Sequence, residues 1–192
     1  ALIRSLIRVF TGKISLSGVS ISSGGRPAAA EVDVEVETAL GAVTSTNEYI
    51  AKEHGDQGMF ATLCLGIINP RTGLLAYVNA GHLPLVIIGK SGVRTFLGAT
   101  GSSVGIDSES RYRSAVARIE PGEVLFGYTD GVTEAMSPDE ALYSRERFFA
   151  LLERPASSAP ELIDRVKADL FTHTRHAPQS DDITMIAVHR KC

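Results

Sequence analysis

The stretch from Val124 to Glu134, with the sequence VLFGYTDGVTE, joins an apolar run to an Asp-Gly pair and then to a polar segment. The apolar run is too short for a helix and follows the turn signal Pro121-Gly122, so it predicts a buried strand. Rigid backbone holds a carboxylate at the end of such a strand, and an adjacent glycine lets other groups approach closely. This arrangement suits a metal ligand, but Asp-Gly is also a common turn dipeptide. Taken alone, the pair favours the turn.

Length and composition indicate one ordinary globular domain. The 192 residues are 44% hydrophobic and 21% charged, and we expect residues 1–192 to form a single domain with a sizeable core. The net charge of −3 gives no basic footprint for nucleic acid, and no apolar run is long enough for membrane insertion. Cys64 and Cys192 form no disulfide framework, which favours a reducing, cytoplasmic setting.

Helical patterns flank a Ser- and Gly-rich segment in the first part of the chain. Apolar residues recur at helical spacing from Leu2 to Phe10, with Arg4 and Arg8 on the other side. Residues 11–30 predict either a flexible segment or part of a hairpin. A further helix is expected at about Val36–Glu53.

Short strands predominate in the middle of the chain. Six runs carry the apolar or alternating pattern of strands: Met59–Ile68, Leu74–Ala80, Leu85–Ile88, Val93–Leu97, Tyr112–Ile119 and Val124–Tyr128. Tight turns between them predict an antiparallel meander.

Two helices and a last strand complete the pattern. Helices are expected at Pro138–Glu153 and from the cap Ser158, with Glu161 three residues on, to about His173. The strand is Ile183–Val188. Strands in a block, with helices before and after, indicate the α+β class.

A second acidic site mirrors the first, because Asp181 and Asp182 stand directly before the last strand. If that strand pairs antiparallel with Val124–Tyr128, Asp130 and Asp181 meet at one sheet edge. Carboxylates gathered there repel one another, and a divalent ion such as Mg²⁺ or Mn²⁺ removes that penalty. The alternative is two solvated acidic loops, which the spacing alone slightly favours.

The chain from Met59 onward resembles the bacterial metal-dependent serine/threonine phosphatases of the PP2C superfamily, in the SpoIIE and RsbU branch. Six short motifs occur in the family's order and at its intervals. They are Met59–Leu63, Tyr77–Pro84, Thr100-Gly101 with Val104-Gly105, Pro121–Glu123, Tyr128–Ala135 and Asp181–Thr184.

This resemblance implies a sandwich of two antiparallel β-sheets flanked by helices, in α-β-β-α layers. It implies that Asp130 and Asp181 are catalytic metal ligands, with Asp182 as a secondary candidate. The family site holds two divalent ions, Mn²⁺ or Mg²⁺, and metal-bound water attacks the phosphorus of phosphoserine or phosphothreonine. The implied partner is a phosphorylated STAS-type anti-sigma-factor antagonist or a similar phosphoprotein, in stress-response signalling through sigma-factor regulation.

One family motif is missing from its expected place. The family carries another metal-binding Asp in an upstream Gly-Asp-x-Ser-Gly motif, whereas Gly55-Asp56 falls at the wrong position and reads as a helix-ending turn. We therefore expect an N-terminally truncated piece of a phosphatase, which would expose a sheet edge and favour a homodimer.

Two rival functions stay open. The first is a non-catalytic pseudophosphatase or protein-binding domain of the same fold, without the bridging ligand. The second is a metal-dependent hydrolase acting on a small-molecule or nucleotide phosphoester, although the chain has no P-loop.

Other reactive side chains favour structural roles. Cys64 lies mid-strand, where an inert buried thiol is expected. His82 falls in a predicted bend that begins at Asn79. The remaining histidines, including His54 and His173, lack ligand spacing and are expected to be solvated.

Overall fold

The computed structural model of the chain describes residues 29–175 and 177–191. It divides into two compact units. Unit 1 comprises the described residues up to His82 together with Ala99–Arg118, and unit 2 comprises Leu83–Gly98 with the described residues from Ile119 onward. The expected helix Leu2–Phe10 and nearly all of the segment 11–30 lie outside the described residues. No helix within the described part has the length and apolarity needed to span a bilayer.

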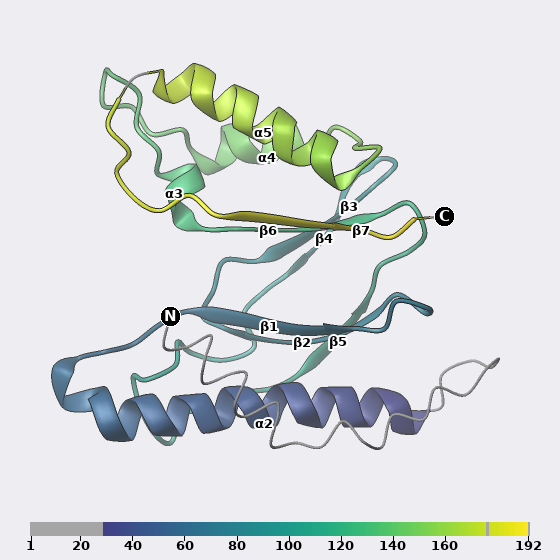
Figure 1. Cartoon of the computed structure of the whole chain (residues 1–192), viewed down its shortest axis with the longest axis vertical. Coiled ribbons are helices and arrows are strands. Elements are labelled where there is room, and N and C mark those ends of the chain that lie inside the picture. The colour runs from purple at the N-terminus through teal and green to yellow at the C-terminus, as the bar shows by residue number, and fades with distance from the viewer. Residues whose placement is uncertain (1–28, 176, 192) are drawn as a thin grey trace. The chain divides into compact units, whose positions relative to one another are not determined.

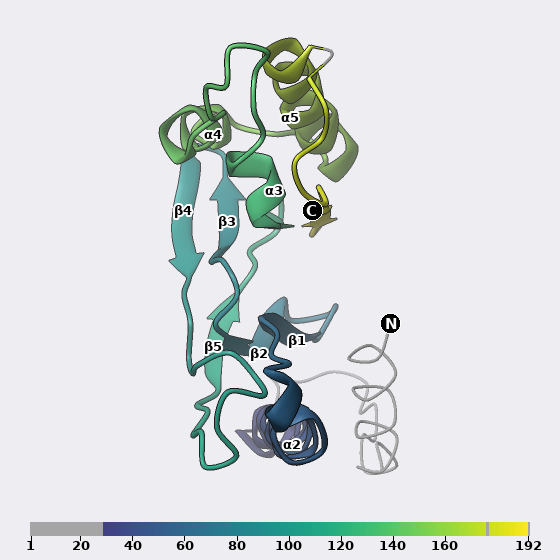
Figure 2. The same ribbon diagram turned by 90° about the vertical axis from the view of Figure 1, so that its left-hand side faces the viewer.

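Unit 1 is a three-stranded antiparallel sheet covered by one long helix (Figures 1 and 2). The strands are β1 (Leu63–Ile68), β2 (Leu74–Ala80) and β5 (Ala115–Arg118), in the order β1-β2-β5. The helix α2 (Ala29–His54) starts earlier than the expected Val36. It ends in the short turn η2 (Gly55–Gln57), which confirms the helix-ending role of Gly55-Asp56. The core of this unit is Ala39, Val43, Ile50, Leu63, Val78, Ala80, Val104 and Tyr112.

Asn79 fixes the bend after β2. Its side-chain oxygen accepts a hydrogen bond from the backbone N–H of His82 (2.8 Å), and its backbone carbonyl accepts one from Thr100 (2.7 Å). A Cβ on Gly101 would lie 2.4 Å from the ring of Tyr112, so only glycine fits there. The expected bend is confirmed, and two of the motifs in this unit serve the scaffold.

Unit 2 is a four-stranded antiparallel sheet with helices α4 and α5 on one face (Figure 1). Its strands are β3 (Leu85–Gly89), β4 (Gly92–Leu97), β6 (Val124–Tyr128) and β7 (Met185–His189), in the order β4-β3-β6-β7. The helices are α3 (Asp130–Thr133), α4 (Arg145–Leu152) and α5 (Ala159–Thr174). Their apolar faces bury Val86, Phe126, Tyr128, Phe148, Leu152, Leu162, Val166 and Leu170.

The predicted helix Pro138–Glu153 is wrong at its start, because α4 begins only at Arg145. The preceding residues form a loop in which the N–H of Ser137 donates to the carbonyl of Ala141 (2.9 Å). Glu140 has a φ of 61° and Ser144 a φ of 72°, so the backbone there is not helical. The Ser144 hydroxyl then caps α4 by accepting the Arg147 N–H.

The cap of α5 is confirmed, since Ser158 Oγ accepts the Glu161 N–H at 3.3 Å. The Glu161 carboxylate reaches back one residue further than a standard capping box, to the N–H of Ser157 (2.6 Å).

Glu123 joins β4 to the turn before β6. The side chain of this nearly buried residue accepts Nε (2.5 Å) and Nη2 (2.7 Å) of Arg94, and also the N–H of Glu120 (2.7 Å). Both carboxylate oxygens are therefore satisfied within the protein. The Pro121–Glu123 motif is structural in this fold.

We expect Glu123→Ala to lower the free energy of unfolding by about 2 kcal/mol, because hydrogen bonds to a charged, poorly hydrated group are lost. Urea denaturation measures the change. The matched control is Asp164→Ala on the exposed face of α5, which should shift stability by less than about 0.5 kcal/mol. Equal effects of the two substitutions would contradict a structural role for Glu123.

Candidate functional site

The pairing of β6 with β7 brings the two acidic segments together. The register runs from Val124 opposite His189 to Tyr128 opposite Met185. It continues past the strands, because the N–H of Thr129 donates to the carbonyl of Thr184 (3.1 Å). The expectation that these strands are antiparallel neighbours is confirmed. The segment that carries Asp130 therefore lies beside the segment that precedes β7.

Thr129 links the two segments through its side chain. Its hydroxyl donates to the carbonyl of Asp182 (2.8 Å) and accepts the N–H of Thr184 (2.9 Å). One side chain thus satisfies a donor and an acceptor on the opposite segment. The sequence motif contains Thr129, but its cross-strand role depends on the pairing and could not be assigned from the motif alone.

Gly131 allows the closest approach between the two segments. A Cβ built at this position would lie 2.6 Å from the carbonyl oxygen of Asp182 and 3.4 Å from the carbonyl carbon of Asp181. Real Cβ atoms do not come as close to backbone as 2.6 Å. The glycine is needed for space, and any side chain there would push the two segments apart.

The three sequence-predicted site residues are all exposed carboxylates on these segments: Asp130, Asp181 and Asp182. One oxygen of Asp130 accepts the N–H of Gly131 (3.1 Å), and one oxygen of Asp181 accepts the N–H of Asp182 (2.7 Å). The second oxygen of each forms no hydrogen bond within the described residues. Both aspartates therefore keep an open oxygen, the donor type that Mg²⁺ and Mn²⁺ prefer.

Carboxylate oxygens are the type of ligand that a hard divalent ion prefers, but the candidate site offers few of them. No group of three or more His, Cys, Asp or Glu side chains that could hold a metal is found among residues 29–175 and 177–191. Mg²⁺ keeps several waters and is commonly bound through one or two carboxylates, so the small number of donors does not conflict with such an ion.

His173 is half-buried, and it forms two hydrogen bonds across the helices of unit 2 that the sequence did not predict. Its Nε2 lies 2.9 Å from the carbonyl of Ala141, and its Nδ1 lies 3.2 Å from Nη1 of Arg147. A carbonyl can only accept and a guanidinium can only donate, so the neutral imidazole protonated on Nε2 satisfies both contacts. These partners are remote in sequence, and no local pattern could have revealed them.

Asp169 completes this linkage between α4, α5 and the loop before α4. It accepts the hydroxyl of buried Tyr143 (2.6 Å) and a two-pronged interaction from Arg147 (2.8 and 3.1 Å). The Arg147 hydrogen bond, together with that of Tyr143, holds the pKa of Asp169 below its ordinary value despite its partial burial. The cluster is satisfied internally and stabilises the loop beside the candidate site.

Cys64 is not a candidate nucleophile. It lies within β1, and burial raises the pKa of its thiol to about 11. A thiol with that pKa stays protonated at neutral pH and is a poor nucleophile, although Cys64 is half-buried and not fully buried as expected.

Comparisons with known proteins agree with this architecture. The family model described as Stage II sporulation protein E (SpoIIE) matches residues 27–191. Protein IcfG of Synechocystis sp. is 41% identical over 194 residues, covering 98% of this chain and 30% of that protein. Phosphoserine phosphatase RsbU of Bacillus subtilis is 26% identical over 144 residues, covering 74% of this chain and 42% of that protein. The chain thus spans less than half the length of these two relatives.

A solved structure shows the same fold. The SiaA-PP2C domain of Pseudomonas aeruginosa matches with a TM-score of 0.69 at 19% identity, over 98% of this chain and 69% of that chain. Likeness at this identity shows the fold and no more. It confirms the expected α+β PP2C class, with two antiparallel sheets and accompanying helices.

We expect Gly131→Ala to weaken Mn²⁺ binding at least about tenfold, because the new Cβ displaces the backbone of Asp182 and moves Asp181 away from Asp130. Isothermal titration calorimetry measures the affinity. Gly98→Ala is the matched control, since a Cβ there meets nothing within 4 Å. An unchanged affinity in Gly131→Ala would show that the spacing of the two segments does not matter for the ion.

We expect Asp169→Asn to destabilise the protein near neutral pH and to have little effect in acid. A carboxyl with a lowered folded pKa contributes its full stability above the unfolded pKa of about 3.9, and loses it as the pH falls through the folded value. Urea unfolding of both proteins from about pH 7 to about pH 3 measures the difference. A gap that stays constant across this range would contradict the assignment.

Proposed function

Because the chain belongs to the SpoIIE family and has the fold of PP2C-like phosphatase domains, we propose that it serves a metal-dependent protein serine/threonine phosphatase as its catalytic domain. The observation that supports this most is the meeting of the Asp130 and Asp181 segments at one end of the β6–β7 pair. Each of the two aspartates offers an open carboxylate oxygen there.

Asp130 and Asp181 would hold the divalent ion, Mg²⁺ or Mn²⁺, with Asp182 as a secondary ligand. Such an ion, once bound, supplies positive charge beside the phosphoryl oxygens and lowers the pKa of a coordinated water. The hydrogen bonds that each aspartate makes to the next residue's N–H fix its orientation. Thr129 and Gly131 hold the two segments that carry these aspartates close together. No covalent nucleophile is needed, and the protonated Cys64 provides none.

The substrate we propose is a phosphorylated STAS-type anti-sigma-factor antagonist or a similar regulatory phosphoprotein. Support comes from the resemblance of the motifs to the SpoIIE and RsbU branch and from the similarity of the chain to RsbU, a phosphoserine phosphatase. The output would be transcriptional control through sigma-factor regulation. This proposal concerns the whole protein, of which the chain resembles one part.

A pseudophosphatase or protein-binding domain of the same fold is the second candidate. It is favoured by one specific observation, the absence of a three-ligand metal group among the described residues. The two candidates differ in metal binding and in turnover, so both can be tested on the same protein.

We expect Asp130→Asn and Asp181→Asn each to lower the Mn²⁺-dependent hydrolysis of a phosphoserine peptide by at least about 100-fold, because each removes a charged ligand. The assay uses the protein expressed from its complete coding sequence. Asp139→Asn, an exposed carboxylate on the loop before α4, is the matched control and should keep full activity.

Two results would contradict the catalytic assignment. One is activity that survives Asp130→Asn, and the other is activity that persists in EDTA without added metal. Calorimetry that detects no divalent-ion binding would instead support the binding-domain alternative.

A further inference from the structure

A cavity of about 150 Å³ lies in unit 2, where the C-terminal end of α5 meets the residues after α3 and the segment before β7. We call it the α5 pocket. Its apolar lining includes Ala135, Met136, Leu170, Phe171, Pro178 and Ile183.

The α5 pocket adjoins both acidic segments of the candidate site. Ser180, which lines it, directly precedes Asp181, and its hydroxyl donates to the carbonyl of Glu134 (3.5 Å). Ala135, which also lines it, follows Glu134 in the segment that begins at Asp130. A chain whose phosphoryl group lies against Asp130 and Asp181 therefore has this pocket within a few residues' reach.

The size of the α5 pocket suits one side chain. Pockets for small-molecule ligands usually measure roughly 300–1,000 Å³, whereas a cavity of roughly 150 Å³ holds a benzene-sized group. Two of its large apolar lining residues are exposed to solvent, Met136 at 42% and Phe171 at 65%. Exposed apolar side chains grouped at a pocket are typical of a contact surface.

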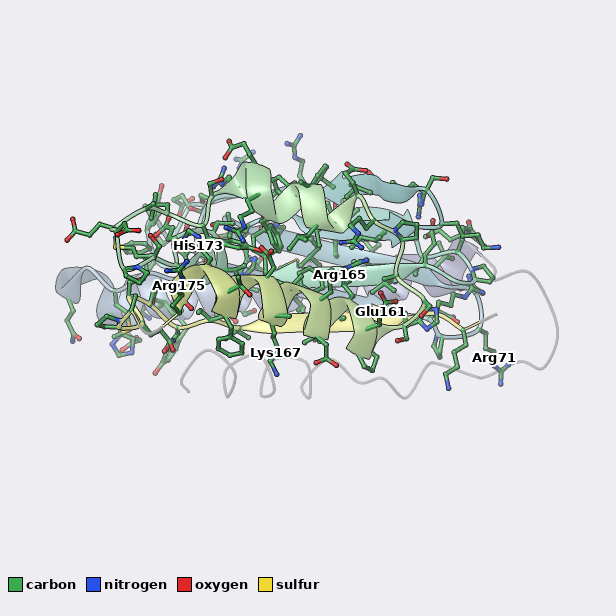
Figure 3. The ribbon with its side chains drawn as sticks, turned by 90° about the horizontal axis from the view of Figure 1, so that it is seen from above. Arg71, Glu161, Arg165, Lys167, His173 and Arg175 are labelled. Carbon is green, nitrogen blue, oxygen red and sulfur yellow. The ribbon has the colours of Figure 1, made fainter. Side chains whose placement is uncertain are left out.

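Among the described residues, Arg175 is the cation that lines the α5 pocket. Arg175 follows α5 with a φ of 50°, and Figure 3 shows it at the C-terminal end of that helix, near His173. Its backbone N–H donates to Phe171 (2.8 Å), but its guanidinium forms no hydrogen bond or ion pair within the described part of the chain. An unpaired guanidinium at the rim of an apolar pocket complements a ligand that carries an apolar group beside an acidic one.

We propose that the α5 pocket receives one apolar side chain of the phosphoprotein substrate, while Arg175 pairs with an acidic side chain next to it. This inference rests on the proposed phosphatase function and adds a basis for substrate choice. The two aspartates act on the phosphoryl group, which is common to all phosphoserine substrates. The α5 pocket recognises the substrate residues that flank the phosphoserine.

A set of phosphoserine peptides tests the proposal. In a Gly-rich background, one Leu is placed at each position from three before to three after the phosphoserine, with or without an adjacent Asp. The protein from the complete coding sequence is assayed with Mn²⁺, both for kcat/KM and for peptide binding by fluorescence anisotropy. Hydrolysis of p-nitrophenyl phosphate, which has no flanking residues, is the reference activity.

We expect one Leu position to raise kcat/KM at least about tenfold over the Leu-free peptide, because a buried Leu side chain leaves water. Phe171→Ala should reduce that preference to about twofold or less, and Phe96→Ala, an exposed aromatic on β4 at the opposite edge of the sheet, should preserve it. Arg175→Ala should abolish the added effect of Asp, while Arg175→Lys should keep part of it. All four variants should hydrolyse p-nitrophenyl phosphate at the wild-type rate.

Equal kcat/KM for all peptides, or a Leu preference that survives Phe171→Ala, would overturn the proposal while leaving the phosphatase function intact. Loss of turnover on every substrate, p-nitrophenyl phosphate included, would instead overturn the phosphatase function. The anisotropy measurements then still test whether the α5 pocket binds a substrate side chain. A Leu-dependent affinity that disappears in Phe171→Ala supports this binding, and a uniform affinity for all peptides refutes it.

Discussion

The antiparallel pairing of β6 with β7, extended by the side chain of Thr129, is the interaction on which the candidate site depends. It places Asp130 beside a segment that follows it much later in the chain. The Thr129 hydroxyl bonds to both Asp182 and Thr184 of that segment, and Gly131 leaves room for it. Because backbone and side-chain bonds act together, they hold the two segments side by side.

The buried part of unit 2 makes this pairing rigid. Every residue of β6 is buried, whereas β7 alternates between half-buried and exposed positions. Tyr128, two residues before Asp130, packs against the ring of Phe148 at 4.5 Å between centroids, so the core extends to the end of the strand. A carboxylate at that point moves little, because a close-packed interior holds the backbone beneath it. The more exposed strand β7 is held in position by its pairing with the buried strand β6.

Much of this arrangement was predictable from the sequence, and the failures have one physical cause. The strand β6 and the helix α5 carry strong local signals, a short apolar run after a turn and a Ser cap with Glu three residues on. Their positions follow from such signals, whereas the nearness of the Asp130 and Asp181 segments depended on the pairing of β6 with β7, which the sequence could only suppose. The start of α4 does not, because Leu142 fits a helical period but pairs with Met136 in a β-bridge. The hydrogen bonds of His173 could not be predicted for the same reason, because its partners Ala141 and Arg147 are remote in sequence.

The scaffold residues and the proposed site residues differ in how fully their polar atoms are satisfied. Both carboxylate oxygens of Glu123 accept hydrogen bonds, from Arg94 and from the N–H of Glu120. The side-chain oxygen of Asn79 accepts the N–H of His82 in the bend after β2. Such groups hold the fold and have no oxygen left for a ligand. Asp130 and Asp181 each use one oxygen to fix their own orientation and leave the other towards solvent. An oriented carboxylate with an open oxygen loses little conformational freedom on binding a cation, and that is the property a metal ligand needs.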